Sequence, residues 1–278
     1  MTAYILPFEK MHGLGNDFIM LEKRHLPNGA NLSKLAKILC DIHFGIGADG
    51  IIIVDLSVVQ NADFEWEYIN SDGSGAQMCG NGMRCFAKYV FERGFTDKTT
   101  FMVKTKAGII IPTIEDDGSV TVNMGIPRLP NTIQQELNVD NEIIKYTYIE
   151  TGNPHCVIFV DERFSGSDFK RLGPVIENHK IFPDRTNVEF VHVLNRNELR
   201  VMVWERGCGP TLACATGAGA SLVASCINNF AESSLKVHLP GGILNAHWDK
   251  NTNCIFINGS ATFVYTGQYN LEPKAVCL

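Results

Sequence analysis

The chain has 278 residues, of which 45% are hydrophobic and 19% are charged, as in an ordinary soluble globular protein with room for two modest domains. Its net charge of −6 argues against a nucleic-acid-binding surface. No apolar run approaches the roughly 20 residues that a membrane-spanning helix needs. The N-terminal segment lacks the basic flank and long apolar core of a secretion signal. We therefore expect a cytoplasmic protein with no nucleic-acid or membrane partner.

The first half of the chain predicts strands that alternate with two helices. A helix is expected over residues 32–41, where apolar side chains recur at helical spacing. A second helix is expected after Gly82, ending near Arg93 before Gly94. The strands expected in this half span residues 8–10, 18–22, 51–55, 64–69, 100–104, 108–115 and 120–124.

The second half begins with a polar segment containing two prolines, residues 127–141, which we interpret as a linker. Helices are predicted over residues 168–178 and again after Gly217. The expected strands span residues 144–150, 156–160, 187–193, 198–204, 235–237, 243–248, 254–258 and 261–265.

Many short strands with short connections and few helices predict an α+β fold. We expect two pseudo-symmetric domains, each a curved, mostly antiparallel and barrel-like sheet around one central helix. The first domain should span residues 1–128 and the second residues 129–263, and the tail, about 264–278, can return to the first.

Three landmarks recur in the same order at nearly one spacing, which predicts two copies of one structural unit. The first two have an offset of 137 (152 − 15 and 187 − 50), and the third has an offset of 135 (214 − 79). The matching pairs are residues 15–19 with 152–156, residues 50–54 with 187–191, and Cys79 with Cys214.

Nine cysteines in irregular spacing form no disulfide framework, so a reducing compartment is indicated. There is no C-x-x-C pair, and no metal site is predicted. Cys156 and Cys208 do not align between the copies, so we do not expect them to be catalytic. The cysteines interpreted as small core residues are Cys40, Cys85, Cys226, Cys254 and Cys277.

Cys79 and Cys214 differ from the others because each precedes a glycine-bounded helix start, in residues 78–82 and 213–217. A cysteine at a helix N-terminus meets free backbone N–H groups and the positive end of the helix dipole, which lowers a thiol pKa. The same N–H groups can hold a carboxylate. Two such sites in one chain suggest two thiols that act on one small anion.

Two thiols facing one carbon suit a proton exchange between its two faces, in which one thiolate removes the α-proton and the other thiol donates one. Helix N-termini aimed at the neighbouring carboxylate stabilise the charge that develops on it. No lysine motif for pyridoxal phosphate stands out, so we expect no cofactor. The backbone groups expected to bind the carboxylate belong to Gly80, Asn81, Ala215 and Thr216.

The chain resembles the diaminopimelate epimerase family over essentially its whole length. The motifs that carry the resemblance are residues 8–18, 78–85, 152–155, 185–190 and 204–209. The resemblance implies interconversion of LL- and meso-2,6-diaminopimelate in lysine and cell-wall precursor synthesis, without a cofactor. It also implies a cytoplasmic homodimer and two mirrored domains, each a barrel-like sheet around a helix.

Carried over to this sequence, the family pattern makes Cys79 and Cys214 the acid/base thiols. Glu205 would bind the reacting amino end and, with His155, tune the thiols, while Arg206 would pair with the distal carboxylate. The alternative interpretation is that these residues are structural. An isolated Asn is more often a turn residue, and a lone His such as His155 is more often structural. The residues implied to hold the distal amino and carboxylate groups are Asn16, Asn70, Asn153 and Asn187.

The sequence departs from the family pattern at two positions. Ala215 stands where the second motif usually has glycine, which matters only if the backbone there needs a positive φ. Gly50 stands where some members have a glutamine that reaches the substrate, so that contact is missing here.

Two other functions stay open at this point. A proline- or hydroxyproline-racemase-type enzyme shares the use of two thiols. The residues that favour a longer substrate with a polar far end are Asn70, Asn153, Asn187 and Arg206. A non-catalytic amino-acid-binding protein on the same scaffold is the other alternative.

Overall fold

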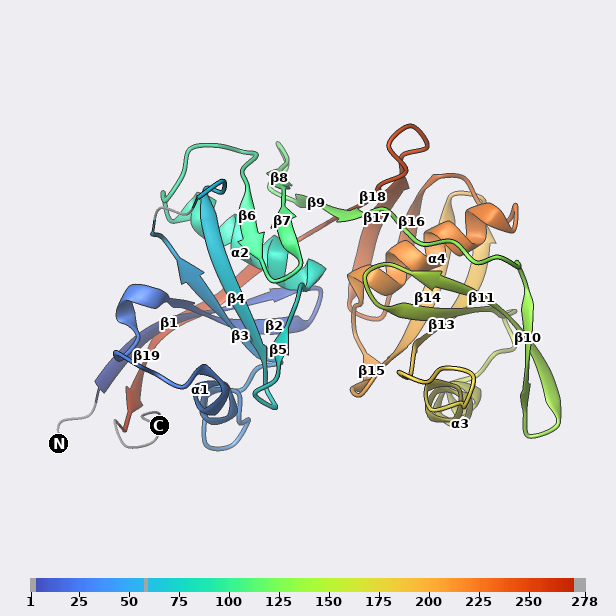
Figure 1. Ribbon diagram of the computed structural model, residues 1–278, viewed down its shortest axis with the longest axis horizontal. Helices are drawn as coiled ribbons and strands as arrows, with labels where there is room; N and C mark the ends of the chain where they lie inside the picture. The colour runs from blue at the N-terminus through green and yellow to red at the C-terminus, as the bar shows by residue number, and fades with distance from the viewer. Residues whose placement is uncertain (1–3, 58–59, 273–278) are drawn as a thin grey trace. The chain divides into compact units, whose positions relative to one another are not determined.

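The computed structural model describes residues 4–57 and 60–272 of the chain (Figure 1). Cys277, expected to be a core residue, and the last residues of the predicted tail lie outside this part. The chain divides into two compact units, of which unit 1 is Met1–Val122 with Ser260–Leu278 and unit 2 is Asn123–Gly259.

Unit 1 contains a sheet in the order β19-β1-β2-β3-β4-β6-β7, with β5 beside β4. Helices α1 (Leu32–Leu39) and α2 (Gly80–Glu92) both pack against β3, and every residue of β3 is buried as a result. A strand covered on both faces is expected to be apolar throughout, as residues 51–54 are. The strands are β1 (Tyr4–Gly13), β2 (Asn16–Glu22), β3 (Gly50–Asp55), β4 (Phe64–Asn70), β5 (Gly75–Ala76), β6 (Val103–Thr105), β7 (Gly108–Ile110), β8 (Pro112–Ile114) and β19 (Thr262–Leu271).

The second sheet, most of which belongs to unit 2, has the order β10-β11-β12-β13-β14-β16-β17-β18-β9-β8, with β15 beside β14. Helix α4 (Ala215–Ile227) packs against most of these strands, and α3 (Gly166–Glu177) packs on β13 and β14. Small residues let α4 approach the sheet, since a Cβ on Gly219 would lie 3.1 Å from Ile255 Cγ2. The strands are β9 (Val120–Gly125), β10 (Gln135–Val139), β11 (Glu142–Glu150), β12 (Pro154–Phe159), β13 (Asn187–Asn195), β14 (Glu198–Glu205), β15 (Gly209–Thr211), β16 (Ser234–Leu239), β17 (Gly242–Trp248) and β18 (Ile255–Gly259).

The two units repeat each other in strand register. In unit 1 the parallel pair β2/β3 aligns Phe18 with Gly50, and in unit 2 the pair β12/β13 aligns His155 with Asn187. Both positions differ by the predicted offset of 137 (155 − 18 and 187 − 50). Helices α2 and α4 have starts and ends that differ by 135 (215 − 80 and 227 − 92). The predicted duplication is therefore confirmed residue by residue.

The predicted α+β class with two mostly antiparallel sheets is confirmed. The parallel ladders are β2/β3 and β4/β6 in unit 1 and their counterparts β12/β13 and β14/β16 in unit 2. In each unit the strand order is an open path, so the sheets are curled around α2 and α4 without closing into barrels.

The predicted linker at residues 127–141 is wrong in part, because it contains strand β10. This strand pairs with β11 in a hairpin whose turn, Asp140 and Asn141, has positive φ at both residues. Leu137 and Val139 are buried, an alternation that the neighbouring prolines obscured in the sequence. The predicted strand at 108–115 is also divided, into β7 and β8.

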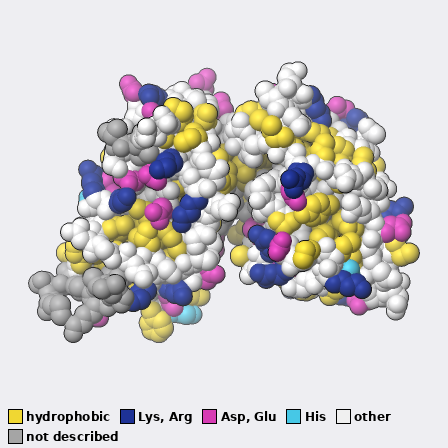
Figure 2. Space-filling model, viewed as in Figure 1, with side chains coloured by type: hydrophobic (Ala, Val, Ile, Leu, Met, Phe, Trp, Pro, Cys, Tyr) yellow, Lys and Arg dark blue, Asp and Glu magenta, His cyan; other side chains and the backbone are white. Residues whose placement is uncertain are grey.

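The surface of both units carries intermixed acidic and basic side chains (Figure 2). This mixture agrees with the small net charge of −6. Within the described ranges, no helix is both long enough and apolar enough to cross a membrane.

Candidate active site

Cys79 and Cys214 are the N-cap residues of α2 and α4 and have nearly the same backbone conformation. Their φ and ψ angles are −141° and 117° for Cys79 and −132° and 111° for Cys214. In each case the sulfur accepts a hydrogen bond from the N–H three residues on, Gly82 N at 3.4 Å and Gly217 N at 3.3 Å. The first two N–H groups of each helix precede the first intrahelical hydrogen bonds, which Met83 N and Ala218 N donate to the Cys79 and Cys214 carbonyls. Each unit therefore presents a thiol beside donors that can hold an anion.

The Cys79 cluster consists of Cys79, Asn16, Asn81 and Asp49. Asn16 Oδ1 lies 3.7 Å from the Cys79 sulfur and accepts a hydrogen bond from Asn81 Nδ2 at 3.1 Å. Asn16 Nδ2 donates to Asp49 Oδ2 at 2.6 Å, which fixes the direction of the amide. Desolvation raises the pKa of the Asp49 carboxyl group, although hydrogen bonds from Asn16 and the Asp17 backbone oppose this shift.

Arg84 is a fully buried basic residue whose charge interacts with Cys79 of this cluster. Its side chain is 0% exposed, and Nε donates to the Ser260 carbonyl at 3.3 Å. Within the described part of the chain, neither terminal nitrogen of the guanidinium has a hydrogen-bond partner. A Cβ on Gly13 would lie 3.0 Å from Nη2, so only glycine leaves room for the guanidinium. Burial lowers the pKa of Arg84, while the charge of Cys79 acts in the opposite direction.

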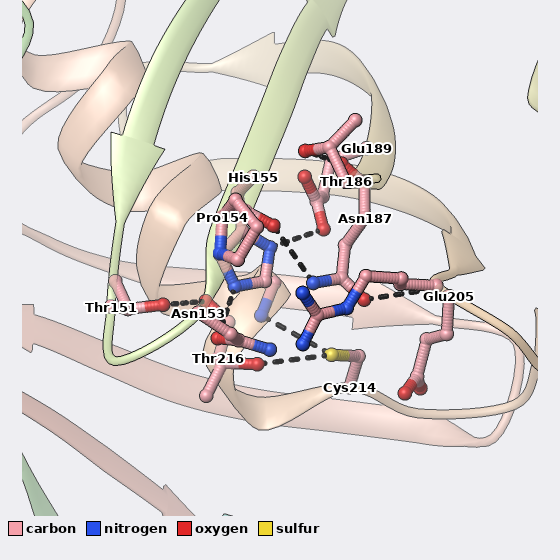
Figure 3. A network of polar contacts seen from close by, with 12 residues as sticks. Thr151, Asn153, Pro154, His155, Thr186, Asn187, Glu189, Glu205, Cys214 and Thr216 are labelled. Atoms are coloured by element: carbon pink, nitrogen blue, oxygen red, sulfur yellow. Dashed lines mark hydrogen bonds and ion pairs between the residues drawn. The ribbon is translucent and has the colours of Figure 1, made fainter. Parts of the chain in front are cut away.

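The Cys214 cluster consists of Cys214, Thr216, Glu205, Glu189 and His155 (Figure 3). The Cys214 sulfur lies 3.3 Å from Thr216 Oγ1 and forms a side-chain hydrogen bond with Glu205. Cys214 is 5% exposed, and its pKa is raised well above the usual value, first by burial and then by the charges of Glu205 and Glu189. These surroundings favour the neutral thiol.

Glu205 is itself surrounded by protein at its carboxyl end. Burial raises its pKa, and a hydrogen bond donated by Thr211 Oγ1 at 2.6 Å opposes the shift. A carboxyl group with a raised pKa next to a thiol can exchange a proton with it. Glu205 therefore lies where its carboxyl group can exchange a proton with Cys214.

His155 and Glu189 form a buried pair below Cys214, and both side chains are 0% exposed. His155 Nδ1 lies 2.7 Å from Glu189 Oε1, and its Nε2 lies 2.8 Å from Asn153 Oδ1. Gly217 leaves room for Glu189, because a Cβ there would lie 2.8 Å from Oε1. His155 thus contacts the Asn153 amide through one ring nitrogen and the Glu189 carboxylate through the other. The charge of Glu189 is one of those that raise the pKa of Cys214.

Asn187 and Arg206 meet at the edge of unit 2. Asn187 Nδ2 donates to the Pro154 carbonyl at 2.8 Å, and its Oδ1 accepts from the backbone N–H of Arg206 at 3.0 Å. The exposed Arg206 guanidinium donates to the Asp184 carbonyl at 3.1 Å. Arg206 also lines a cavity of about 650 Å³ together with Arg185 and Pro154.

The comparison with known proteins decides the family. The model of the family described as Diaminopimelate epimerase matches residues 8–130 and 147–264. A diaminopimelate epimerase from Desulforapulum autotrophicum is 46% identical, with 96% of this chain and 99% of that protein covered. The chain belongs to the diaminopimelate epimerase family.

A second relative, the diaminopimelate epimerase of Heliobacterium modesticaldum, is 43% identical and covers 96% of this chain and all of its own length, 100%. Among solved structures, a hydroxyproline epimerase from Agrobacterium vitis has a TM-score of 0.74 at 14% identity, with 98% of this chain and 94% of that chain covered. That likeness shows a shared fold and no more.

Most of the residues expected from the diaminopimelate epimerase pattern lie in one of the two clusters or beside Arg206. Asn70 is half-buried at the end of β4, where its amide donates to Ser74 Oγ at 2.9 Å. The departure at Ala215 has no backbone cost, because Ala215 begins α4 and does not have a positive φ. At Gly50 a Cβ would lie 2.5 Å from the Tyr68 ring, so a longer side chain does not fit here.

The sequence did not lead us to the charged residues within or next to the two clusters, namely Asp49, Arg84 and Glu189. Glu189 had a detectable signal, since it is a lone acidic residue within the apolar strand β13. Arg84 had a weaker one, a basic residue in a helix whose first eleven residues are buried except for Lys88. Among the described residues no group of His, Cys, Asp and Glu side chains has the arrangement of a metal site. Cys156 is fully buried in the core next to β13, whereas Cys208 is exposed.

Proposed function

We propose that this protein is a two-base epimerase that interconverts LL- and meso-2,6-diaminopimelate without a cofactor. The observation that carries the proposal is the duplicated helix start, with a cysteine as N-cap and its sulfur bound to the third N–H in both units. The family of the chain supports the substrate. In this proposal the enzyme serves lysine and peptidoglycan precursor synthesis as a cytoplasmic homodimer.

The proposed reaction removes the α-proton on one face of the substrate and returns a proton on the other. The barrier lies in the weak acidity of a carbon next to a carboxylate. Backbone N–H groups of Gly80, Asn81, Ala215 and Thr216 would bind that carboxylate and stabilise its additional negative charge. Because these donors belong to helix starts that are already folded, they need no rearrangement during the reaction.

The two thiols have different electrostatic surroundings, which supports different resting states. Two carboxyl groups, Glu205 and Glu189, raise the pKa of Cys214, so we propose that Cys214 rests as a thiol and donates the proton. The buried Arg84 charge acts on Cys79 and favours negative charge there. Cys79 would then be the thiolate that removes the α-proton. In the reverse direction the roles exchange: Cys214, left as a thiolate after donating its proton, removes the α-proton, and Cys79 donates the proton that it took up.

The far end of the substrate would be recognised by amides and one guanidinium. Arg206 would pair with the distal carboxylate, since a cation is the complement that a second carboxylate requires. Asn16, Asn70, Asn153 and Asn187 carry both donors and acceptors and can bind an amino and a carboxylate group. Asn16, Asn153 and Asn187 are already oriented by Asp49, His155 and Pro154.

The test replaces each proposed acid/base group and follows exchange of the substrate α-proton in deuterated water. Cys79→Ser and Cys214→Ser should each lower epimerisation of diaminopimelate by at least about 10²-fold, the usual contribution of one acid/base group. Cys254→Ser is the matched control, because this half-buried thiol lies outside both cysteine clusters and donates to the Thr252 carbonyl at 3.7 Å. Full turnover by the double serine variant would refute the mechanism.

The same assay separates the alternatives. A proline-racemase-type enzyme would exchange the α-proton of proline and not of diaminopimelate. A binding protein would hold diaminopimelate in calorimetry and leave its α-proton unexchanged. We expect exchange with diaminopimelate only.

A further inference from the structure

Glu177, the last residue of α3, is a buried carboxylate outside the two cysteine clusters. Its residue is 6% exposed, and acidic residues are rarely this buried unless they are paired. It lies outside the family motifs described above, and the partners of its carboxylate, Trp204, Gly207 and Arg185, are not members of either cysteine cluster.

Three donors surround the Glu177 carboxylate. Oε2 accepts a hydrogen bond from Trp204 Nε1 at 2.8 Å, and Oε1 accepts one from the backbone N–H of Gly207 at 2.8 Å. Arg185 Nη1 reaches the same Oε1 at 3.3 Å. The backbone carbonyl of Glu177 in addition accepts from the N–H of Thr186 at 3.3 Å.

The donors come from the two segments that carry the proposed distal site. Arg185 and Thr186 precede Asn187, while Trp204 and Gly207 flank Glu205 and Arg206. The two segments are joined directly by the hydrogen bond from Arg206 N to Asn187 Oδ1 at 3.0 Å. Glu177 therefore ties both strand ends to the end of one helix.

One of these donors has a backbone conformation that needs support. Arg185 has a φ of 58°, whereas Gly207, with a φ of 80°, is a glycine and adopts this conformation readily. A left-handed conformation at a non-glycine residue persists only where neighbouring contacts hold it. The helix also packs directly on this segment, because a Cβ on Gly173 of α3 would lie 2.5 Å from the Trp204 indole.

We propose that Glu177 is a positioning residue that holds Asn187 and Arg206 in the geometry that binds the far end of the substrate. The inference rests on the proposed function, since it takes that far end to be a distal amino and carboxylate group. Glu177 does not touch the reacting carbon, so its loss should weaken substrate binding and leave the proton transfers intact.

Glu177→Gln tests this role with little change in side-chain volume. One carboxylate oxygen becomes an NH2 group that faces an N–H donor, so one of the charge-assisted hydrogen bonds is lost. We expect the KM for diaminopimelate to rise about tenfold, with kcat within about twofold of wild type. Calorimetric binding of diaminopimelate to each variant in the Cys79→Ser background should show the same loss, because KM alone does not equal a dissociation constant.

The matched control is Glu142→Gln, which removes an exposed carboxylate of unit 2 that lies 3.6 Å from Arg171. It should leave KM, kcat and binding unchanged. Trp204→Phe is a second variant, since it deletes the donor to Oε2, together with part of the indole that packs on Gly173, and should raise KM in the same direction. It also decides the question if Glu177→Gln does not fold.

Two results would overturn the inference in an enzyme whose wild type epimerises diaminopimelate. The first is a Glu177→Gln variant with unchanged KM and unchanged binding of diaminopimelate. The second is a variant that loses kcat and thermal stability while KM is unchanged, which would indicate a purely structural role. A wild-type enzyme that does not turn over diaminopimelate would refute the proposed function instead, so the two failures are distinguishable.

Discussion

Replacing His155 with leucine removes the partner of a fully buried carboxylate. Glu189 is 0% exposed, and its Oε1 lies 2.7 Å from His155 Nδ1. In the described part of the chain, Glu189 Oε2 has no hydrogen-bond partner. His155→Leu therefore leaves an acidic group without compensation in an apolar strand, a change that usually costs about 3–5 kcal/mol.

The expected loss of stability is large enough to measure directly. At about 2–4 °C per kcal/mol, the melting temperature should fall by about 6–20 °C. Urea unfolding followed by tryptophan fluorescence measures the free energy of unfolding. Trp204 and Trp248 report on unit 2 and Trp66 on unit 1, so the loss should appear in the unit 2 transition if the units unfold separately.

A double-mutant cycle with Glu189→Leu measures the interaction free energy between His155 and Glu189 separately from the contribution of each residue. Replacing both residues of a buried pair with apolar side chains is often nearly neutral, whereas removing one is not. The double variant should therefore lose much less stability than the sum of the two single losses. Additive losses, within about 0.5 kcal/mol, would refute the reasoning that His155 and Glu189 act as a pair. Epimerase activity should fall in the two variants that lack His155, because Asn153 loses the ring that orients it.

The remaining predictions concern the surroundings of Cys214. The Glu205 carboxylate opposes the thiolate, so Glu205→Gln should lower the Cys214 pKa towards its usual value. Iodoacetamide labelling of Cys214, followed by mass spectrometry over a pH series, should then begin at lower pH than in wild type, and an unchanged profile would contradict the assignment. Gly217→Ala places a Cβ 2.8 Å from Glu189 Oε1 and should destabilise the protein by about 1–3 kcal/mol, measured by urea unfolding. Gly166→Ala is its control, since a Cβ there meets nothing within 4 Å, and equal losses in the two variants would exclude the steric cause.

The duplicated unit and the two helix starts were predictable from the sequence alone. A helix start depends on a few neighbouring residues, so the pattern of residues 79–82 and 214–217 was enough to place a cysteine at the N-terminus of each helix. The constant offset of the landmarks predicted the repeat, which the register of β2/β3 and β12/β13 confirms. The relation between the two sulfur atoms stays a prediction.

Only the tertiary structure showed which charged residues lie near each thiol. Asp49 meets Asn16 across 33 residues, and Glu189 meets His155 across 34. Such pairs form where the folded sheet brings distant strands side by side, and no local pattern encodes them. The same reason explains strand β10, whose short polar sequence becomes a strand because β11 offers it an edge to pair with. Residues near a helix start obey local rules, whereas the electrostatic difference between Cys79 and Cys214 depends on contacts that exist only in the folded chain.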